Sequence, residues 1–157
     1  MPCLNDMKII KRAEPGKKEY LELLLEADPS EKMLDRYLED GTLFVWEEKG
    51  TPVAVAVVVP VPGGACELKN LAVAEAARGR GYGKRMVEYL FRFYHGKYPE
   101  MYVGTADISC GCKGFYQKLG FRYTHTVSGF FTENYPEPIY ENGALIEDMA
   151  YFVKELK

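Results

Sequence analysis

Hydrophobic positions along the chain follow two periods, one typical of strands and one typical of helices. Runs enriched in β-branched and aromatic residues, or with alternating apolar and polar residues, predict strands. Their ranges are residues 7–12, 42–46, 52–59, 66–73, 101–105, 121–127 and 145–156. Apolar residues at three- and four-residue steps predict two helices within residues 17–40, joined at Asp28-Pro29-Ser30, with Pro29 at the first position of the second helix.

Two further helices are predicted in the second half of the chain. A long helix opens from the glycine-rich stretch 79–83 and ends before Gly96, and a short one covers 114–119. The element order β-αα-β-β-β-α-β-α-β-β predicts a mixed α/β architecture. At 157 residues the chain has the usual size of one domain, so we expect a single domain over residues 1–157.

Charge and composition narrow the classes of function. The formal net charge of −3 gives no overall positive field of the kind that drives nucleic-acid binding. The longest apolar run, 53–61, is far shorter than the roughly 20 residues that span a bilayer. The first six residues lack the basic start and apolar stretch of a secretory signal. We therefore expect a cytoplasmic protein that binds neither nucleic acid nor membranes.

The four cysteines do not form a pattern typical of disulfides or of a metal site. A chain of this length can build its own core, so we expect reduced thiols. Cys110-Gly-Cys112 lacks the wider spacing of common zinc ligands, and no second pair accompanies it. The sequence therefore predicts no metal site.

A glycine-rich turn between a predicted strand and the long helix has the composition of an anion site. Its glycines allow positive φ and leave no Cβ in the way of a ligand, and its basic residues add charged donors. The first turn of the following helix adds backbone N–H groups and the positive end of the helix dipole. The candidate pyrophosphate contacts are Arg78, Gly79, Arg80, Gly81, Tyr82, Gly83 and Lys84.

Two other phosphate-binding motifs fail on spacing. A dinucleotide fingerprint starting at Gly79 requires glycine at the position of Lys84, and one starting at Gly81 requires it at Met86. A Walker A loop requires Ser or Thr directly after Lys84, where the chain has Arg85. The turn therefore belongs to a different class of phosphate site.

The pattern Arg78-x-x-Gly81-x-Gly83, preceded by the strand at 67–73, resembles the acyl-CoA pyrophosphate motif of the GNAT N-acetyltransferases. The segment from Gly114 to Phe121 is similar to the second signature of that family, and the order of elements matches over residues 7–156. The resemblance implies a mostly antiparallel, seven-stranded sheet with flanking helices. It also implies acetyl-CoA as cosubstrate, no metal, and acetyl transfer to a primary amine of a small molecule or peptide by direct attack in a ternary complex.

The same resemblance implies roles for individual residues. Backbone groups of residues 71–73 (Leu71, Ala72 and Val73) would pair with pantetheine and polarise the thioester carbonyl. Tyr116 would be the general acid for the departing thiolate, because a phenol of pKa about 10 stays protonated at neutral pH; alternatively it packs and orients the thioester. Glu67 would be the base for the amine, with a water chain and a plain strand glutamate as the alternatives.

Two departures from the family pattern keep alternatives open. Ser109 stands where many members have Asn, so it would offer pantetheine a hydroxyl instead of an amide. Cys112 stands where Ala is common, and we interpret it as a small packing residue. The alternative function is an inactive or weak GNAT-fold module that senses acyl-CoA. The acceptor amine and the oligomeric state, with a homodimer as one option, stay open.

Overall fold

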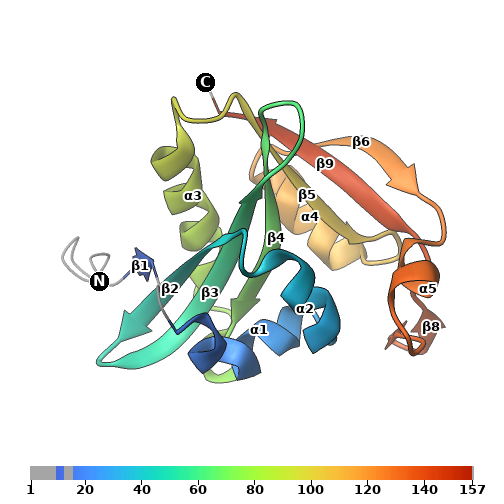
Figure 1. Cartoon of the computed structure of the whole chain (residues 1–157), viewed down its shortest axis with the longest axis horizontal. Helices are drawn as coiled ribbons and strands as arrows, with labels where there is room; N and C mark the ends of the chain where they lie inside the picture. The colour runs from blue at the N-terminus through green and yellow to red at the C-terminus, as the bar shows by residue number, and fades with distance from the viewer. Residues whose placement is uncertain (1–9, 13–15, 157) are drawn as a thin grey trace. The chain divides into compact units, whose positions relative to one another are not determined.

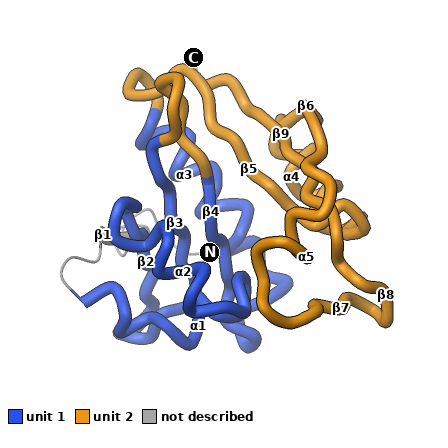
Figure 2. Tube along the Cα trace, turned by 45° about the vertical axis from the view of Figure 1, so that its right-hand side comes forward, with its two compact units in different colours: residues 1–60, 68–94 blue, residues 61–67, 95–157 orange. Residues whose placement is uncertain are grey.

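The computed structural model describes residues 10–12 and 16–156, and for residues 10–12 only the backbone. Within these residues the chain forms two compact units. Unit 1 comprises residues 1–60 and 68–94, and unit 2 comprises residues 61–67 and 95–157 (Figure 2). Each unit carries some of the candidate site residues, so we describe the units in turn.

The strands of unit 1 follow one another in the sheet order, and the first two pairs are antiparallel. β1 (Ile10–Arg12) pairs with β2 (Thr42–Glu48), β2 pairs with β3 (Thr51–Pro60), and β4 (Cys66–Val73) follows β3 in the sheet order. Lys49 and Gly50 connect β2 to β3 with φ of 51° and 80°, the positive values that a type I′ hairpin turn requires. Residues 53–59 of β3 are all buried, as expected for a strand covered on both faces.

The helices of unit 1 are the 3-10 helices η2 (Lys17–Tyr20) and η3 (Glu75–Ala77) and the α-helices α1 (Leu21–Ala27), α2 (Glu31–Tyr37) and α3 (Tyr82–Tyr94) (Figure 1). Along α3, Met86, Val87 and Leu90 are buried. The ring of Phe44 on β2 packs edge-on against Phe93 on α3, with centroids 5.1 Å apart. The predicted long helix is therefore present, and its apolar face packs on the core of unit 1.

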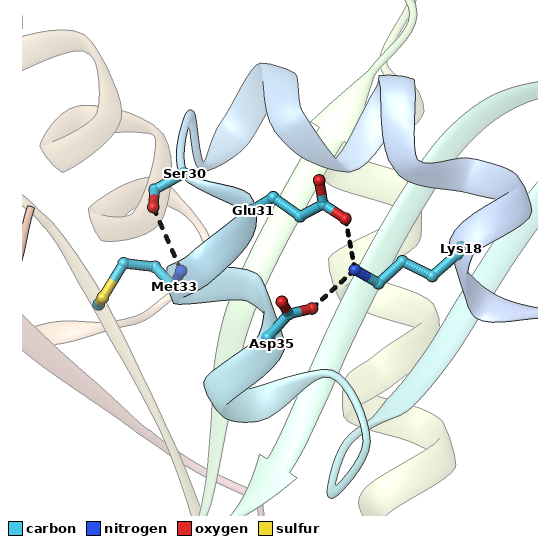
Figure 3. A network of polar contacts seen from close by, with 5 residues as sticks. All are labelled: Lys18, Ser30, Glu31, Met33 and Asp35. Carbon is cyan, nitrogen blue, oxygen red and sulfur yellow. Dashed lines mark hydrogen bonds and ion pairs between the residues drawn. The ribbon is translucent and has the colours of Figure 1, made fainter.

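The start of α2 corrects one sequence expectation. Pro29 lies before the helix, and Ser30 is the N-cap because its side chain accepts a hydrogen bond from the Met33 amide at 3.2 Å (Figure 3). Ser is a better N-cap than Pro, since it satisfies a first-turn amide. Lys18 of η2 forms ion pairs with Glu31 and Asp35 of α2, both at 2.7 Å (Figure 3).

Unit 2 contains a sheet in which β9 (Met149–Glu155) lies between β5 (Glu100–Ala106) and β6 (Arg122–Val127), antiparallel to both. Its other elements are α4 (Cys110–Lys118), α5 (Phe130–Asn134) and a small hairpin of β7 (Tyr140–Glu141) and β8 (Ala144–Leu145). Every residue of β6 is exposed. β6 therefore forms the outer edge of this sheet.

Unit 2 also holds most of the differences from the sequence expectations. α4 begins at Cys110 and not at Gly114, because Ser109 supplies the N-cap position and its carbonyl accepts from the Lys113 amide at 3.0 Å. The last strand begins at Met149 and not at residue 145, since residues 144–145 pair with β7 instead. α5 and the β7–β8 hairpin were not predicted.

The predicted fold class is confirmed: the chain is mixed α/β, the pairs β1–β2, β2–β3, β5–β9 and β6–β9 are antiparallel, and helices accompany the strands in each unit. Strand β4 has the predicted bounds, 66–73. Of the first predicted strand, residues 10–12 are found and residues 7–9 lie outside the described residues. Among residues 16–156, no helix is both long and apolar enough to cross a membrane.

Candidate functional site

The glycine-rich turn in unit 1 has the backbone that only glycine adopts easily. Gly79 and Gly81 have φ of 78° and 83°. A Cβ at Gly79 would meet no atom within 4 Å, and one at Gly81 would meet only the Arg85 side chain, at 3.9 Å. The turn therefore exposes its backbone to an open space, which is the condition for a ligand to lie against it.

The turn leads directly into the N-terminus of α3. The Arg85 amide donates to the Gly81 carbonyl at 3.1 Å, which closes the first helical turn. Amides that precede this bond have no acceptor within a helix, and the helix dipole adds positive potential at the same end. Arg80 and Lys84 are exposed beside these amides. This geometry suits a diphosphate.

Two residues of the turn have side chains that serve the scaffold. Arg78 donates from Nε to the Val73 carbonyl at 3.1 Å and pairs with Glu26 at 3.4 Å, so it braces the turn against β4 and α1. Tyr82 is only 7% exposed, packs edge-on against Trp46 and donates its hydroxyl to the Glu48 carboxylate. The hydrogen bond to Glu48, followed by burial, raises the pKa of Tyr82. The Tyr82 side chain is therefore engaged within unit 1, and its backbone amide is the group that can bind a ligand.

Residues 71–73, the predicted pantetheine contacts, form the last part of β4. Ala72 is buried, and Leu71 and Val73 are half-buried. The Ala74 amide donates to the Val53 carbonyl on β3 at 2.8 Å, which fixes the end of the strand. The proposed role of residues 71–73 depends on their backbone groups, so their apolar side chains are compatible with that role.

Helix α4 of unit 2 positions two other candidates. Ser109 is 6% exposed at the N-cap, and Tyr116 lies near the other end of the helix, half-buried. The Tyr116 ring packs edge-on against Phe115 and Phe121, with centroids 5.1 and 5.5 Å apart. Burial, and second an electrostatic interaction with Cys112 one turn earlier, raise the pKa of the Tyr116 phenol above its usual value. Tyr116 therefore keeps its proton at neutral pH.

Glu67, the candidate base, lies half-buried at the start of β4, in the part of that strand that belongs to unit 2. Burial, and then the charge of Glu67, raise the pKa of Tyr151 to about 12. The Tyr151 phenol is therefore within electrostatic reach of the Glu67 carboxylate. Sequence reasoning missed Tyr151, because it depends on the register between β5 and β9.

Cysteine chemistry adds nothing to the site. Cys66 is buried next to Glu67, its thiol lies 3.8 Å from the Glu100 carbonyl, and burial raises its pKa to about 12, so it is a packing residue. Cys110 and Cys112 are free and exposed on α4. Among residues 16–156 no three His, Cys, Asp or Glu side chains are grouped to hold a metal ion.

Comparisons with known proteins agree on one family. A family model described as an acetyltransferase (GNAT) domain matches residues 39–123. The uncharacterized N-acetyltransferase YvbK of Bacillus subtilis is 31% identical over 155 residues, which is 98% of this chain and 100% of that protein.

Solved structures give the same result. A GNAT family acetyltransferase from Elizabethkingia anophelis with acetyl-CoA bound has a TM-score of 0.89 and 35% identity, covering 93% of this chain and 96% of its own. A Bacillus subtilis acetyltransferase in complex with CoA has a TM-score of 0.85 and 31% identity, covering 94% and 98%.

Proposed function

The chain belongs to the GNAT acetyltransferase family, and we propose that it transfers the acetyl group of acetyl-CoA to a primary amine of a small molecule or peptide by direct attack in a ternary complex. It is an acetyl-CoA-dependent acetyltransferase, as the relatives that bind acetyl-CoA or CoA are. The observation that carries the proposal is the open turn at the N-terminus of α3, with Gly79 and Gly81 at positive φ.

The donor half of the reaction uses this turn. The amides of the first turn of α3, with Arg80 and Lys84, would hold the CoA pyrophosphate, and Arg78 would hold the turn in shape. Backbone groups of residues 71–73 would pair with pantetheine and polarise the thioester carbonyl. The buried Ser109 would add one hydroxyl to the pantetheine contacts.

The chemical step exchanges one bond for another. The neutral amine attacks the thioester carbon, a C–N bond forms, and the tetrahedral intermediate collapses with loss of the C–S bond. The amine nitrogen loses a proton and the CoA thiolate gains one. The reaction therefore needs a base at the amine and an acid at the sulfur.

Tyr116 is the proposed acid. Its raised pKa guarantees a protonated phenol and also makes the proton harder to release. A thiolate that forms in the same buried surroundings is desolvated too, which raises its own affinity for the proton. The two effects offset each other, so donation from Tyr116 to the departing sulfur stays feasible.

Glu67 is the proposed base, acting directly or through a water molecule. A primary amine with a pKa near 10.4 reaches the site mostly as ammonium at pH 7 and must lose a proton before attack. Glu67 is half-buried, and Tyr151 stays neutral, so Tyr151 adds no negative charge beside the Glu67 carboxylate.

Domain organisation and cellular location are also part of the proposed function. Residues 1–157 would work as a single N-acetyltransferase domain, which the full-length match to a relative supports. We place it in the cytoplasm, since Cys66, Cys110 and Cys112 are free thiols in the described residues. The alternative, an acyl-CoA-sensing module with little activity, is favoured only by Ser109 in place of Asn.

Two measurements test the proposal in sequence. Melting curves with acetyl-CoA, CoA, NAD and ATP identify the ligand class, and thiol release across an amine library then tests transfer. We expect acetyl-CoA and CoA to raise the melting temperature and at least one primary amine to release CoA. Stabilisation by CoA without thiol release from any amine would favour the sensing module.

A further inference from the structure

Tyr151 on β9 has an unusual position because the neighbouring strand carries a glycine. Tyr151 is paired with Gly104 on β5, and a Cβ at Gly104 would lie 2.9 Å from Cε1 of Tyr151 and 2.8 Å from Sδ of Met149. Contacts this short do not occur for real Cβ atoms. The ring of Tyr151 therefore leans over the β5 backbone, into space that any other residue at position 104 would fill.

His125 stacks on one face of the Tyr151 ring. The two residues are paired between β6 and β9, and their rings stack with centroids 5.0 Å apart and planes 10° from parallel. The Thr124 hydroxyl lies 3.2 Å from the Tyr151 carbonyl and 2.7 Å from Nδ1 of His125. The contact with Nδ1 helps to fix the orientation of the imidazole.

Cys66, the residue before Glu67, contacts the Glu100 carbonyl at the start of β5, the strand that pairs with β9. The charge of Glu67 acts on the Tyr151 phenol, which stays protonated because its pKa is raised to about 12. Strand alternation places Tyr151 on the opposite face of the sheet from Phe152. Tyr151 thus stacks on the ring of His125 and is affected by the charge of Glu67, and all three residues belong to unit 2.

The segment of the chain that carries both rings is acidic. No Lys or Arg lies between Arg122 and Lys154. The acidic residues of this stretch are Glu133, Glu137, Glu141, Glu147 and Asp148. A segment with net negative charge favours a cationic ligand over an anionic one, and aromatic faces attract a nearby cation.

We propose that Tyr151 and His125 form an aromatic wall of the acceptor site beside Glu67, and that the acceptor is a cationic amine that carries a planar ring and no carboxylate. The inference rests on the proposed function, because it assigns the acceptor side of the same reaction. Tyr151 is a specificity-determining residue in this proposal, and its ring, more than its hydroxyl, makes the contact.

Three amines isolate these features: 2-phenylethylamine, 2-cyclohexylethylamine, which has a puckered ring of similar size, and phenylalanine, which adds a carboxylate. For the wild type we expect kcat/KM for 2-phenylethylamine to exceed that for 2-cyclohexylethylamine by about two- to tenfold, the scale of an aromatic pair. Phenylalanine should be about tenfold worse than 2-phenylethylamine or more, although its less basic amine is easier to deprotonate.

Variants at Tyr151 and at a control position test whether the Tyr151 ring forms the wall. Tyr151→Leu should reduce the planar-ring preference to near unity, and Tyr151→Phe should keep it. Tyr123→Leu is the control. Tyr123 is 50% exposed and lies on β6 like His125, but it packs against Phe152, on the face of the sheet opposite to Tyr151. The control should keep the wild-type preference. Gly104→Ala, which moves the Tyr151 ring, should lower the preference as Tyr151→Leu does.

Binding of the same amines to the CoA-loaded protein, measured by calorimetry, separates this inference from the proposed function. A planar-ring preference in binding that disappears in Tyr151→Leu supports the wall even if no acetyl transfer occurs, in which case the proposed function fails. Equal preferences in wild type and Tyr151→Leu, in turnover and in binding, would overturn the wall while leaving acetyl transfer intact. Retained CoA affinity in each variant confirms that it is folded.

Discussion

The hydroxyl of Tyr82 donates a hydrogen bond to the carboxylate of Glu48, and this bond ties the first residue of α3 to the end of β2. The Tyr82 ring also packs on Trp46, with centroids 4.8 Å apart. The N-terminus of α3 is therefore fixed by the core of unit 1 before any ligand binds. A turn that is already in place loses less entropy when it receives a diphosphate.

Replacing Tyr82 by Phe tests this anchoring. The ring and its packing on Trp46 remain, but the half-buried Glu48 loses its donor, so we expect a loss of about 1–2 kcal/mol of unfolding free energy at pH 7. The hydrogen bond raises the pKa of Tyr82 in the folded state, so its contribution is complete below the unfolded pKa near 10 and declines as pH rises through the folded value. Urea denaturation at pH 7 and above pH 10 measures both.

Tyr89→Phe is a control for the loss of a tyrosine hydroxyl on the same helix, since Tyr89 is half-buried and contacts Phe44 through its ring. It should change stability by less than Tyr82→Phe. Equal stability losses in the two variants at pH 7 would mean that the Glu48 bond does not anchor the turn.

Much of this fold was predictable because local signals and tertiary structure agree. The bounds of β4 follow from the alternation of apolar and polar residues along 66–73, which matches the alternating burial of the strand. The early start of α4 was missed because none of its residues is buried, so it has no apolar stripe to reveal it, and two glycines weaken its helix propensity. Pro29 was misplaced because Pro and Ser both mark helix starts and stand side by side here.

The candidate site was predictable to a similar extent. The glycine turn was predictable because a backbone with positive φ at a helix start favours glycine, and Gly79 and Gly81 have the expected backbone. The role of the Tyr82 side chain was not predictable, because its partner Glu48 is distant in sequence. The same holds for Tyr151, whose place over Gly104 depends on strand register, which a single sequence does not reveal.

The turn itself is tested by Gly81→Asp. A carboxylate would project where the diphosphate is proposed to lie, so the rise in melting temperature caused by CoA should largely disappear. For the wild type, CoA at about 100 times its dissociation constant should add roughly 2.7 kcal/mol of stability. The measurement is the melting temperature with and without saturating CoA.

Gly63→Asp provides a matched control for backbone strain. Gly63 has φ of 97° and open space around it, in the connection between β3 and β4. Both variants should lose similar stability without ligand, and only Gly81→Asp should lose the response to CoA. A full CoA response in Gly81→Asp would remove the turn from the binding site.

Tyr116→Phe tests the proposed general acid. The substitution keeps the ring packed between Phe115 and Phe121 and removes only the proton donor. Turnover should fall by about 10²-fold or more, with little change in CoA affinity. Steady-state kinetics with a reactive amine, with single-turnover data to establish that chemistry limits the rate, measure the effect. Unchanged turnover under those conditions would leave Tyr116 a packing role.

Glu67→Gln tests the proposed base. The substitution preserves size and hydrogen bonding but removes basicity. In the wild type, the logarithm of kcat/KM should rise with pH through the ionisation of the base. The variant should need a higher pH for comparable rates, because the ammonium must then lose its proton to solvent before attack. Profiles with two amines of different pKa measure this shift.

The two amines separate a base from a binding residue. If Glu67 accepts the proton, the variant should lose more activity with the more basic amine, since less of that amine is neutral at any given pH. If Glu67 only attracts the cation, KM should rise for both amines by a similar factor and the pH profile should keep its shape. The second result, or parallel profiles for wild type and variant, would exclude Glu67 as the base. A solvent-connected water chain would then be the remaining route for the amine proton.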